Sequence, residues 1–484
     1  MAACRMPHAH AAQCFNKKLS GLRVRVPTQV RDKYGRKMSK SLGNVIDPLE
    51  VINGVSLADL QAKLVAGNLD PKELEKATIM NNQEYPQGIP ECGSDALRFG
   101  LLAHVGAGKD INLDVQRVAA YSNFCNKLWN ATRFAFMYIG RAEAGQAFTP
   151  GALPVALSLH NSTGGPRTDL PSLPDAWILS RLAETVELVD KQLKDYQIAT
   201  AAETIYAFWY KELCNVYLEA IKPIMQLDGS SISNAATKHA TQTVLHACLH
   251  YGLRLLHPFM PFVTEELFNR LALLCGEPRT SIMNAPYPVP GPISALRSPP
   301  AEEAMDIVLK VSASIRSLRA SYLKGPNERH APVVYLVCRN PATLATLSSQ
   351  VETIGALAKS SKSPPPAAVL FVADGCSTPR GCATEVLDKH TEVHVLLKGV
   401  VDLSKEVVRL QKEAAGVQSR LDKLVGKMAM DSYATKCPAA TQVNAPHARA
   451  RPPALSVRSP VKIAHFWNYR RSLQAMSRDT LAPV

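Results

Sequence analysis

The chain has 484 residues, of which 46% are hydrophobic and 20% are charged. This length is enough for two or three domains, and the composition excludes disordered, collagen-like and disulfide-rich proteins. No apolar run approaches the roughly 20 residues of a membrane-spanning helix, so we expect no membrane partner. The 11 cysteines do not form two closely spaced pairs. The sequence therefore predicts no structural zinc site and no other metal site.

The net charge of +14 resides mainly in the two ends of the chain. Met1–Gln29 carries five Lys or Arg and no acidic residue, and Thr441–Val484 carries seven Lys or Arg against one Asp. The residues between them have a net charge of only +3. Because the body is nearly neutral, charge alone does not identify a nucleic-acid-binding protein, and the motifs must decide.

Composition divides the chain into consecutive segments. Residues 1–29 form a basic leader without helical or strand periodicity, which we interpret as unstructured; a mitochondrial transit peptide is the alternative. Residues 30–140 open with a polar turn and continue as mixed helical structure. Residues 141–173 are rich in Gly, Pro, Ser and Thr, as is typical of a linker.

Residues 174–290 are expected to form an all-helical bundle. Leu182, Val186, Val189 and Leu193 repeat at the 4-3-4 spacing of an amphipathic helix. Further helices are predicted at Ala201–Ile221 and Thr243–Leu256, and another begins at Pro261, which suits the first turn of a helix. Several residues at helical spacings are expected to be structural. They are the aromatic residues Trp129, Phe134, Trp209, Tyr210 and Tyr217, and the histidine pair His246 and His250.

The last third of the chain contains two further patterns. Residues 301–400 predict a small α/β unit, with a helix at Ala301–Leu323 and strands at Val333–Cys338, Val369–Ala373 and His394–Leu397. Residues 401–431 carry an a/d heptad pattern from Leu403 to Met428, which predicts a coiled-coil helix and possible self-association through residues 403–428. Residues 432–484 form a basic tail whose prolines exclude a long helix.

The most informative motif is Lys37-Met38-Ser39-Lys40-Ser41. Two lysines three residues apart, on a loop after a glycine turn, present two ammonium groups that suit a polyphosphate. The serine hydroxyls and backbone N–H groups add further donors, and such a loop would stabilise negative charge on departing pyrophosphate. The alternative is a solvated basic loop. A second segment, Gly93–Phe99, predicts a helix start with polar capping residues.

Together these motifs resemble the valyl-tRNA synthetases, a family of class I aminoacyl-tRNA synthetases. The resemblance spans about Val30 to Tyr433. The segments that carry it are the KMSKS signature at Lys37–Ser41, Leu42–Pro48, Gly88–Gly93, Asp95–Phe99, Asn112–Asp114, Phe124–Ala131, Trp177–Leu182, Glu212–Glu219 and Pro258–Phe268.

The resemblance implies a mainly α fold in which residues 30–140 hold the end of a class I catalytic domain and a stem-contact junction. The bundle would bind the anticodon, and the α/β unit with the coiled coil would form an arm that contacts tRNA. ATP, with Mg²⁺, would be bound by Lys37, Met38, Ser39, Lys40 and Ser41. Within this set, Lys40 would be the main catalytic lysine and Lys37 would assist it.

The implied activity is ATP-dependent attachment of valine to its tRNA, tRNA(Val), in the cytoplasm or, alternatively, in mitochondria. Nothing in the chain matches the HIGH signature, the editing domain or the valine pocket of this family. We therefore expect the isolated chain to be inactive. The alternatives are a non-catalytic tRNA-binding module and a coiled-coil interaction protein.

Overall fold

The computed structural model describes most of the chain between residues 29 and 401, in two compact units divided between Glu302 and Glu303. The described ranges are 29–105, 110–139, 148–151, 172–227, 232–291, 293–323, 325–359, 364–372 and 381–401, with single positions at 412, 415–416, 419 and 422. The predicted coiled-coil arm at 401–431 therefore lies almost entirely outside the described residues, as do most of the linker and both basic ends. None of the helices in the described ranges is long and apolar enough to cross a membrane.

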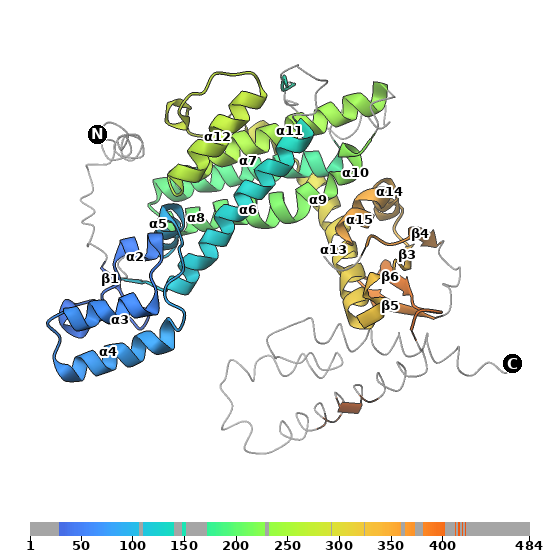
Figure 1. Ribbon diagram of the computed structural model, residues 1–484. Coiled ribbons are helices and arrows are strands. Elements are labelled where there is room, and N and C mark those ends of the chain that lie inside the picture. Colours follow the sequence, from blue (N-terminus) through green and yellow to red (C-terminus); the bar gives the residue numbers. More distant parts are fainter. Residues whose placement is uncertain are drawn as a thin grey trace, which may run out of the picture. The chain divides into compact units, whose positions relative to one another are not determined.

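The first unit begins with short elements that surround the lysine motif (Figure 1). These are β1 (Val30–Arg31), which pairs in parallel with β2 (Ile111–Asn112), the 3₁₀ turn η1 (Lys40–Leu42), and the helices α2 (Pro48–Asn53), α3 (Leu57–Ala66) and α4 (Pro71–Glu84). Local sequence sets the helix starts, because the side chains of Asp47, Ser56 and Asp70 accept backbone N–H bonds at the first turns of α2, α3 and α4.

Two further helices, α5 (Ser94–Leu102) and α6 (Val115–Ile139), connect this region to the bundle. A shared apolar core, which includes Val51, Ile89, Ala96 and Val118, packs α2, α5 and α6 together. Removing these side chains from water stabilises the arrangement by about 1.5–3 kcal/mol for each large aliphatic group. The elements that carry the lysine motif are therefore fixed to the long helix α6.

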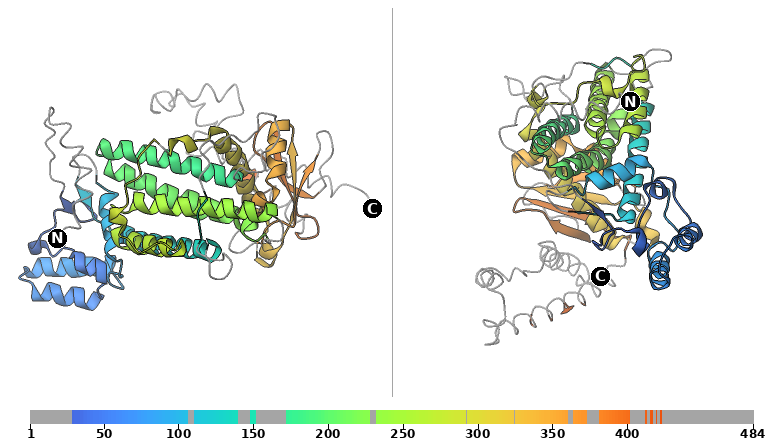
Figure 2. Two further views of the ribbon diagram at one scale, coloured as in Figure 1. Left: turned by 90° about the horizontal axis from the view of Figure 1, so that it is seen from above. Right: turned by 90° about the vertical axis from the view of Figure 1, so that its left-hand side faces the viewer.

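The next part of the chain is a helical bundle, as the sequence predicts. Its helices lie alongside one another and alongside α6 (Figures 1 and 2). Its elements are α7 (Leu173–Lys194), α8 (Ile198–Ala207), a π-helical segment (Phe208–Tyr217), α9 (Leu218–Ala220), α10 (Lys222–Met225), α11 (Ile232–Leu256), α12 (Pro261–Leu274) and the 3₁₀ turns Ile282–Asn284 and Ser294–Leu296. The predicted stripe on α7 is confirmed, because Leu182, Val186 and Val189 are fully buried.

A buried polar cluster ties three parts of this bundle together. The Asp175 carboxylate, at the start of α7, accepts hydrogen bonds from the Tyr217 hydroxyl at 2.5 Å and the Thr241 hydroxyl at 2.8 Å. Ser172 donates to the same carboxylate at 2.7 Å. Burial raises the pKa of Asp175, although these hydrogen bonds act in the opposite direction. The cluster fixes the register of the π-helical segment and α11 against α7.

Three sequence expectations about the first unit are wrong in detail. The helix predicted over Ala201–Ile221 is interrupted by the π-helical segment, in which Trp209 donates its indole N–H to the Gly252 carbonyl at 3.2 Å. Trp129 is not a core residue but is 37% exposed, and Arg270 stacks on its ring. No side chain caps α5; Asp95 instead accepts N–H bonds from the first turn of α12.

The second unit is a four-stranded mixed sheet with helices, as the α/β pattern predicts. Its elements are α13 (Pro299–Tyr322), the 3₁₀ turn Gly325–Arg329, β3 (Val333–Cys338), α14 (Pro341–Ser349), α15 (Val351–Leu357), β4 (Ala368–Val372), β5 (Cys382–Val386) and β6 (Thr391–Leu396). The strand order is β4-β3-β6-β5, with β3 parallel to β4 and antiparallel to β6. Strand β5 was not predicted, because its Thr384 is a buried polar residue that interrupts the apolar pattern and hydrogen-bonds to His394 at 2.8 Å.

Candidate functional site

The lysine motif forms an exposed loop between β1 and α2. We call Lys37–Ser41 the lysine loop. A tight turn precedes it, in which the Gly35 N–H donates to the Asp32 carbonyl at 2.9 Å and the Asp32 N–H donates to the Arg36 carbonyl at 3.0 Å. Gly35 has φ = +79°, a conformation that favours glycine. The turn returns the chain antiparallel to β1, with Lys37 bridged to Arg31.

The buried carboxylate of Asp32 holds this turn. One of its oxygens accepts the Tyr34 and Arg36 backbone N–H groups at 3.1 and 2.8 Å, and the other accepts the Arg36 guanidinium at 2.7 Å. Burial alone would raise the pKa of Asp32. The hydrogen bonds from Arg36 and Asn44, together with the Arg36 charge, outweigh burial and hold the pKa below its usual value.

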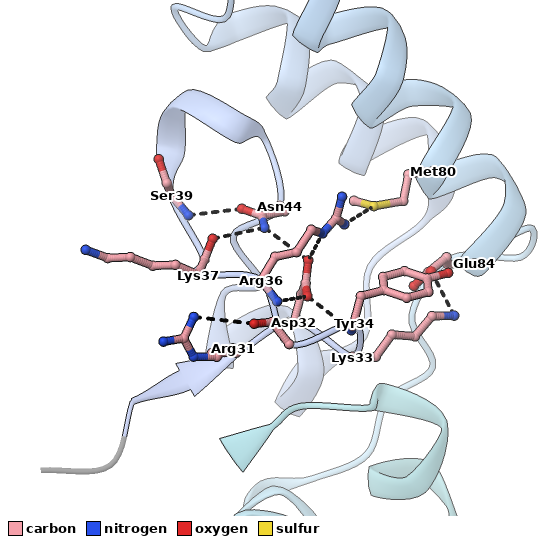
Figure 3. Close-up of polar contacts among 11 residues, drawn as sticks. Arg31, Asp32, Lys33, Tyr34, Arg36, Lys37, Ser39, Asn44, Met80 and Glu84 are labelled. Carbon is pink, nitrogen blue, oxygen red and sulfur yellow. Dashed lines mark hydrogen bonds and ion pairs between the residues drawn. The ribbon is translucent and has the colours of Figure 1, made fainter. Parts of the chain in front are cut away.

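Asn44, which is also buried, connects Asp32 to the loop itself (Figure 3). Its amide nitrogen donates to the second Asp32 oxygen at 3.1 Å and to the Lys37 carbonyl at 3.2 Å. Its amide oxygen accepts the Ser39 N–H at 3.0 Å. The backbone on both sides of Met38 is therefore tied to a single side chain.

The end of the lysine loop is shaped by a cap and a glycine. The Ser39 hydroxyl accepts the Ser41 N–H at 3.1 Å and caps η1, the turn that carries Lys40. Gly43 closes this turn at φ = +63°. A Cβ atom at Gly43 would lie 2.9 Å from the Ala77 Cβ and 3.1 Å from Leu64, so this position packs directly against α3 and α4.

The loop therefore has a fixed backbone and exposed cationic side chains. Lys37 and Lys40 are both exposed, and within the described parts of the chain neither ammonium group has a hydrogen-bond or ion-pair partner. In Figure 3 the Lys37 side chain extends away from the Asp32 cluster. Met38 and Ser39 are half-buried and Ser41 is exposed. All five predicted ATP-binding residues thus lie on one loop.

A cavity of about 930 Å³ lies beside the loop, between it and the helices α2, α3 and α4. Lys40, Ser41 and Asn44 line one side, and residues of α3 and α4 such as Leu64 and Met80 line the other. Lys33 at its edge pairs with Glu84 of α4 at 2.7 Å, so this neighbouring lysine is neutralised by an acid, unlike Lys37 and Lys40.

The donors of the lysine loop suit phosphate oxygens rather than a metal ion. The loop offers ammonium groups, hydroxyls and N–H groups, all of which can donate to an anion. Among the residues that the structure describes, no three His, Cys, Asp or Glu side chains are grouped to hold a metal. The loop therefore presents donors that suit an anion.

Sequence reasoning missed Asp32 and Asn44, the two residues that hold the loop. Each is a polar residue that is only 5% exposed. The available signals are an acid at the start of a glycine-containing turn and an asparagine directly after Gly43. Such residues are common in surface turns, so their burial and their mutual contact could be seen only in the structure.

Comparison with known proteins gives two family matches and many relatives. Residues 22–114 match the family described as tRNA synthetases class I (I, L, M and V). Residues 175–335 match the anticodon-binding domain of tRNA ligase. The first match contains the lysine loop, and the second begins at Asp175, in the first turn of α7.

The similar curated proteins are named valine–tRNA ligases. The chain is 42% identical to that of Mus musculus over 413 residues, which are 85% of this chain and 30% of the relative. The Homo sapiens protein gives the same identity and coverage. The mitochondrial one of Saccharomyces cerevisiae is 38% identical, over 84% of this chain and 34% of the relative.

A solved LeuRS–tRNA–LeuAMS complex from Agrobacterium radiobacter aligns with a TM-score of 0.29 and 19% identity, over 53% of this chain and 24% of that one, which is too distant to inform the fold. The sequence matches, in contrast, cover most of this chain and coincide with the lysine loop and the bundle. The chain is therefore a member of the class I aminoacyl-tRNA synthetases, a homologue of the valine–tRNA ligases that spans about a third of their length.

Proposed function

We propose that this chain forms the KMSKS-loop and tRNA-binding portion of a valine–tRNA ligase. The observation that carries the proposal is the lysine loop, where two exposed ammonium groups without partners in the described structure stand on a backbone fixed by Asn44. Its position within the class I tRNA synthetase match, and the 42% identity to a valine–tRNA ligase, support the proposed reaction class.

The proposed reaction is the activation of valine by ATP. The valine carboxylate attacks the α-phosphorus, a new bond forms between carboxylate oxygen and phosphorus, and the bond to the departing pyrophosphate breaks. Lys40, assisted by Lys37, stabilises the negative charge that grows on the pyrophosphate, where a preorganised cation has its largest effect. The hydroxyls of Ser39 and Ser41 and the backbone beside Met38 supply further donors to the phosphates.

The other segments are assigned to tRNA. Residues 30–140 would combine the lysine loop with the stem-contact junction, and the helices of residues 174–290 would bind the anticodon region of tRNA(Val). Residues 301–400 and the heptad segment 401–431 would form a further tRNA-contacting arm. The match of residues 175–335 to an anticodon-binding domain supports the assignment of the bundle.

The proposal is tested by valine-dependent ATP–pyrophosphate exchange. The 484-residue chain alone is expected to give none, because its sequence contains no HIGH signature. The matching segment of the mouse valine–tRNA ligase is then replaced by residues 30–433 of this chain. In that chimera, K40A should lower the exchange rate about 100-fold or more, and K37A should lower it less.

The control for the chimera is K76A. Lys76 is an exposed lysine of α4, well separated in sequence from the lysine loop. Its ammonium group pairs with Glu73 at 2.7 Å. Its removal should leave the exchange rate unchanged. If K40A and K76A have equal effects in an active chimera, the role proposed for the lysine loop is wrong.

A second candidate function is that of a non-catalytic tRNA-binding module. It is favoured by the anticodon-binding match, which covers a bundle whose core is continuous and well packed. The expected result is saturable binding of tRNA(Val) in preference to other tRNAs by the chain alone. Equal affinity for all tRNAs at high salt, where attraction by the basic ends is weak, would contradict it.

Compartment and association are also proposals. The identity of 42% to the mouse valine–tRNA ligase exceeds the 37% to its mitochondrial counterpart, which supports the cytoplasm. A fluorescent fusion that enters mitochondria would contradict this. The heptad pattern at 403–428 supports self-association, and a monomer in sedimentation at high concentration would contradict it.

A further inference from the structure

Asn44 makes three directed hydrogen bonds and none of them is to a phosphate-binding side chain. Its amide nitrogen faces two acceptors, the Asp32 carboxylate and the Lys37 carbonyl, and its amide oxygen faces one donor, the Ser39 N–H. An amide turned by 180° would place its oxygen against both acceptors. The surrounding groups therefore permit one orientation of this side chain.

Asp32 is the group that fixes this orientation. Its own position is set by two backbone N–H groups and by the Arg36 guanidinium, so the oxygen that receives Asn44 does not depend on the lysine loop. The order of support runs from the turn to Asp32, from Asp32 to Asn44, and from Asn44 to the loop backbone. Both Asp32 and Asn44 are 5% exposed, which strengthens these bonds relative to bonds in water.

The three bonds act on the backbone that orients the lysines. The Lys37 carbonyl and the Ser39 N–H lie on either side of Met38, and Ser39 in turn caps the turn that carries Lys40. If Asn44 released this backbone, both ammonium groups would remain on the loop. The loop backbone that carries them would have to be ordered each time phosphate binds, at a cost in entropy.

We propose that Asn44, oriented by Asp32, is a positioning residue that holds the lysine loop ready for the polyphosphate of its substrate. This role rests on the proposed function of the loop. Asn44 acts through Lys37 and Lys40 and does not itself touch the phosphates. Its effect on binding should therefore become smaller when one of these lysines, Lys40, is removed.

The test uses the 484-residue chain with N44D, K40A and the double variant N44D/K40A. N44D preserves shape, but it removes both amide donors and places a second carboxylate beside Asp32. The first measurement is hydrogen exchange of the Ser39 amide, followed by mass spectrometry or NMR. The second is the dissociation constant for ATP and for inorganic tripolyphosphate. The matched control is N269D, which likewise removes the amide donors of an asparagine and places a second carboxylate beside an acid, here Glu265 in α12, away from the cavity at the loop.

We expect N44D to raise the hydrogen-exchange rate of the Ser39 amide. It should also raise the dissociation constants of both probes about tenfold, as expected when a well-placed set of hydrogen bonds is lost. N269D should lower the melting temperature without either effect. N44D should weaken binding less in the K40A background than in the unmodified chain, because effects that act partly through the same group are not additive. A merely structural residue would not produce this coupling.

Two results would overturn the proposal. One is unchanged Ser39 exchange in N44D; the other is an additive loss in N44D/K40A, which would show that Asn44 acts independently of Lys40. Failure of the proposed function is recognised separately, as equal binding of the probes by the unmodified chain and by K40A. In that case faster Ser39 exchange in N44D would still support the loop-holding contact, and unchanged exchange would overturn it.

Discussion

Gly43 shows at the scale of one residue why the lysine loop has its sequence. Two separate constraints meet there: a positive φ of +63°, and a contact of 2.9 Å between an added Cβ and Ala77. Gly325 in the second unit has nearly the same φ, +62°, and open space within 4 Å. Substitutions at the two glycines therefore distinguish the cost of backbone strain from the cost of steric overlap.

We predict that G43A destabilises the first unit by about 2–4 kcal/mol, because the strain of the left-handed conformation adds to overpacking against α4. G325A should cost its unit only about 1–2 kcal/mol, the strain alone. Urea unfolding followed by circular dichroism measures both. Equal losses in the two variants would show that α3 and α4 yield to the added methyl group.

At the scale of the element, Asp95 shows how one side chain connects two helices. The sequence suggests that it caps its own helix, but it is 8% exposed and accepts the N–H groups of Phe262 and Val263 at 3.1 and 2.6 Å. These are the first-turn donors of α12, so Asp95 fastens α12 to α5. Burial raises the pKa of Asp95, and the hydrogen bonds and the nearby positive charge of Arg98 only partly offset this.

We predict that D95A destabilises the first unit by about 1–3 kcal/mol, because two first-turn N–H groups of α12 lose a largely buried carboxylate acceptor. D95N keeps one acceptor oxygen and should cost about 1 kcal/mol. The comparison variant is D47A, which removes an exposed cap of α2 and should cost no more than about 1 kcal/mol. Denaturant unfolding that ranks D47A equal to D95A would contradict the fastening role.

The elements differ in how far the sequence could predict them. The stripe of α7 and the start of α12 at Pro261 follow from local spacing and were predicted correctly. Trp209 of the π-helical segment bonds to Gly252, which lies 43 residues away in sequence, so local spacing does not show this contact. The lysine loop was visible as a local motif. Its support by Asp32 and Asn44 was not, because it depends on which polar side chains the folded chain buries.

At the scale of the whole molecule, acid should weaken the bundle through two stacked histidines. His246 and His250 lie on α11 with ring centroids 5.8 Å apart, and His250 also stacks on Phe268 at 5.3 Å. His250 is within 3.2 Å of the Arg254 guanidinium, and His246 is within 3.3 Å of the Cys275 sulfur. Burial lowers the pKa of each histidine to about 4, and for His250 the charges of Arg254 and His246 add to this effect.

The sign of the pH dependence follows from these values. Between pH 6.5 and 4 the unfolded chain binds protons at both histidines and the folded bundle does not, so stability is complete above pH 6.5 and falls toward pH 4. Each histidine contributes at most about 1.4 kcal/mol per pH unit. H246Q and H250Q should each flatten the dependence of the unfolding free energy on pH across this range. A slope that neither variant changes would assign the acid sensitivity to other groups.

The charge distribution of the whole molecule makes a prediction about tRNA. The two ends carry most of the net charge of +14, and the body between them carries +3. Phosphate contacts made by the basic ends would not distinguish tRNAs, and such contacts weaken steeply with salt, by about 10³–10⁵ between 50 and 200 mM for six to ten phosphate contacts. Contacts made by the bundle with unpaired anticodon bases depend on shape and stacking and survive salt better.

Titrating the 484-residue chain with tRNA(Val) and with a non-cognate tRNA at increasing salt separates the two sources of affinity. At 50 mM salt both tRNAs should bind with similar affinity, because the basic ends dominate. At 200 mM the non-cognate tRNA should lose most of its affinity and tRNA(Val) should lose less, so the ratio of the two dissociation constants should rise. A ratio that stays near one at every salt concentration would show that the bundle adds no recognition to the attraction by the ends. An anticodon-binding role for α7 to α12 would then be wrong.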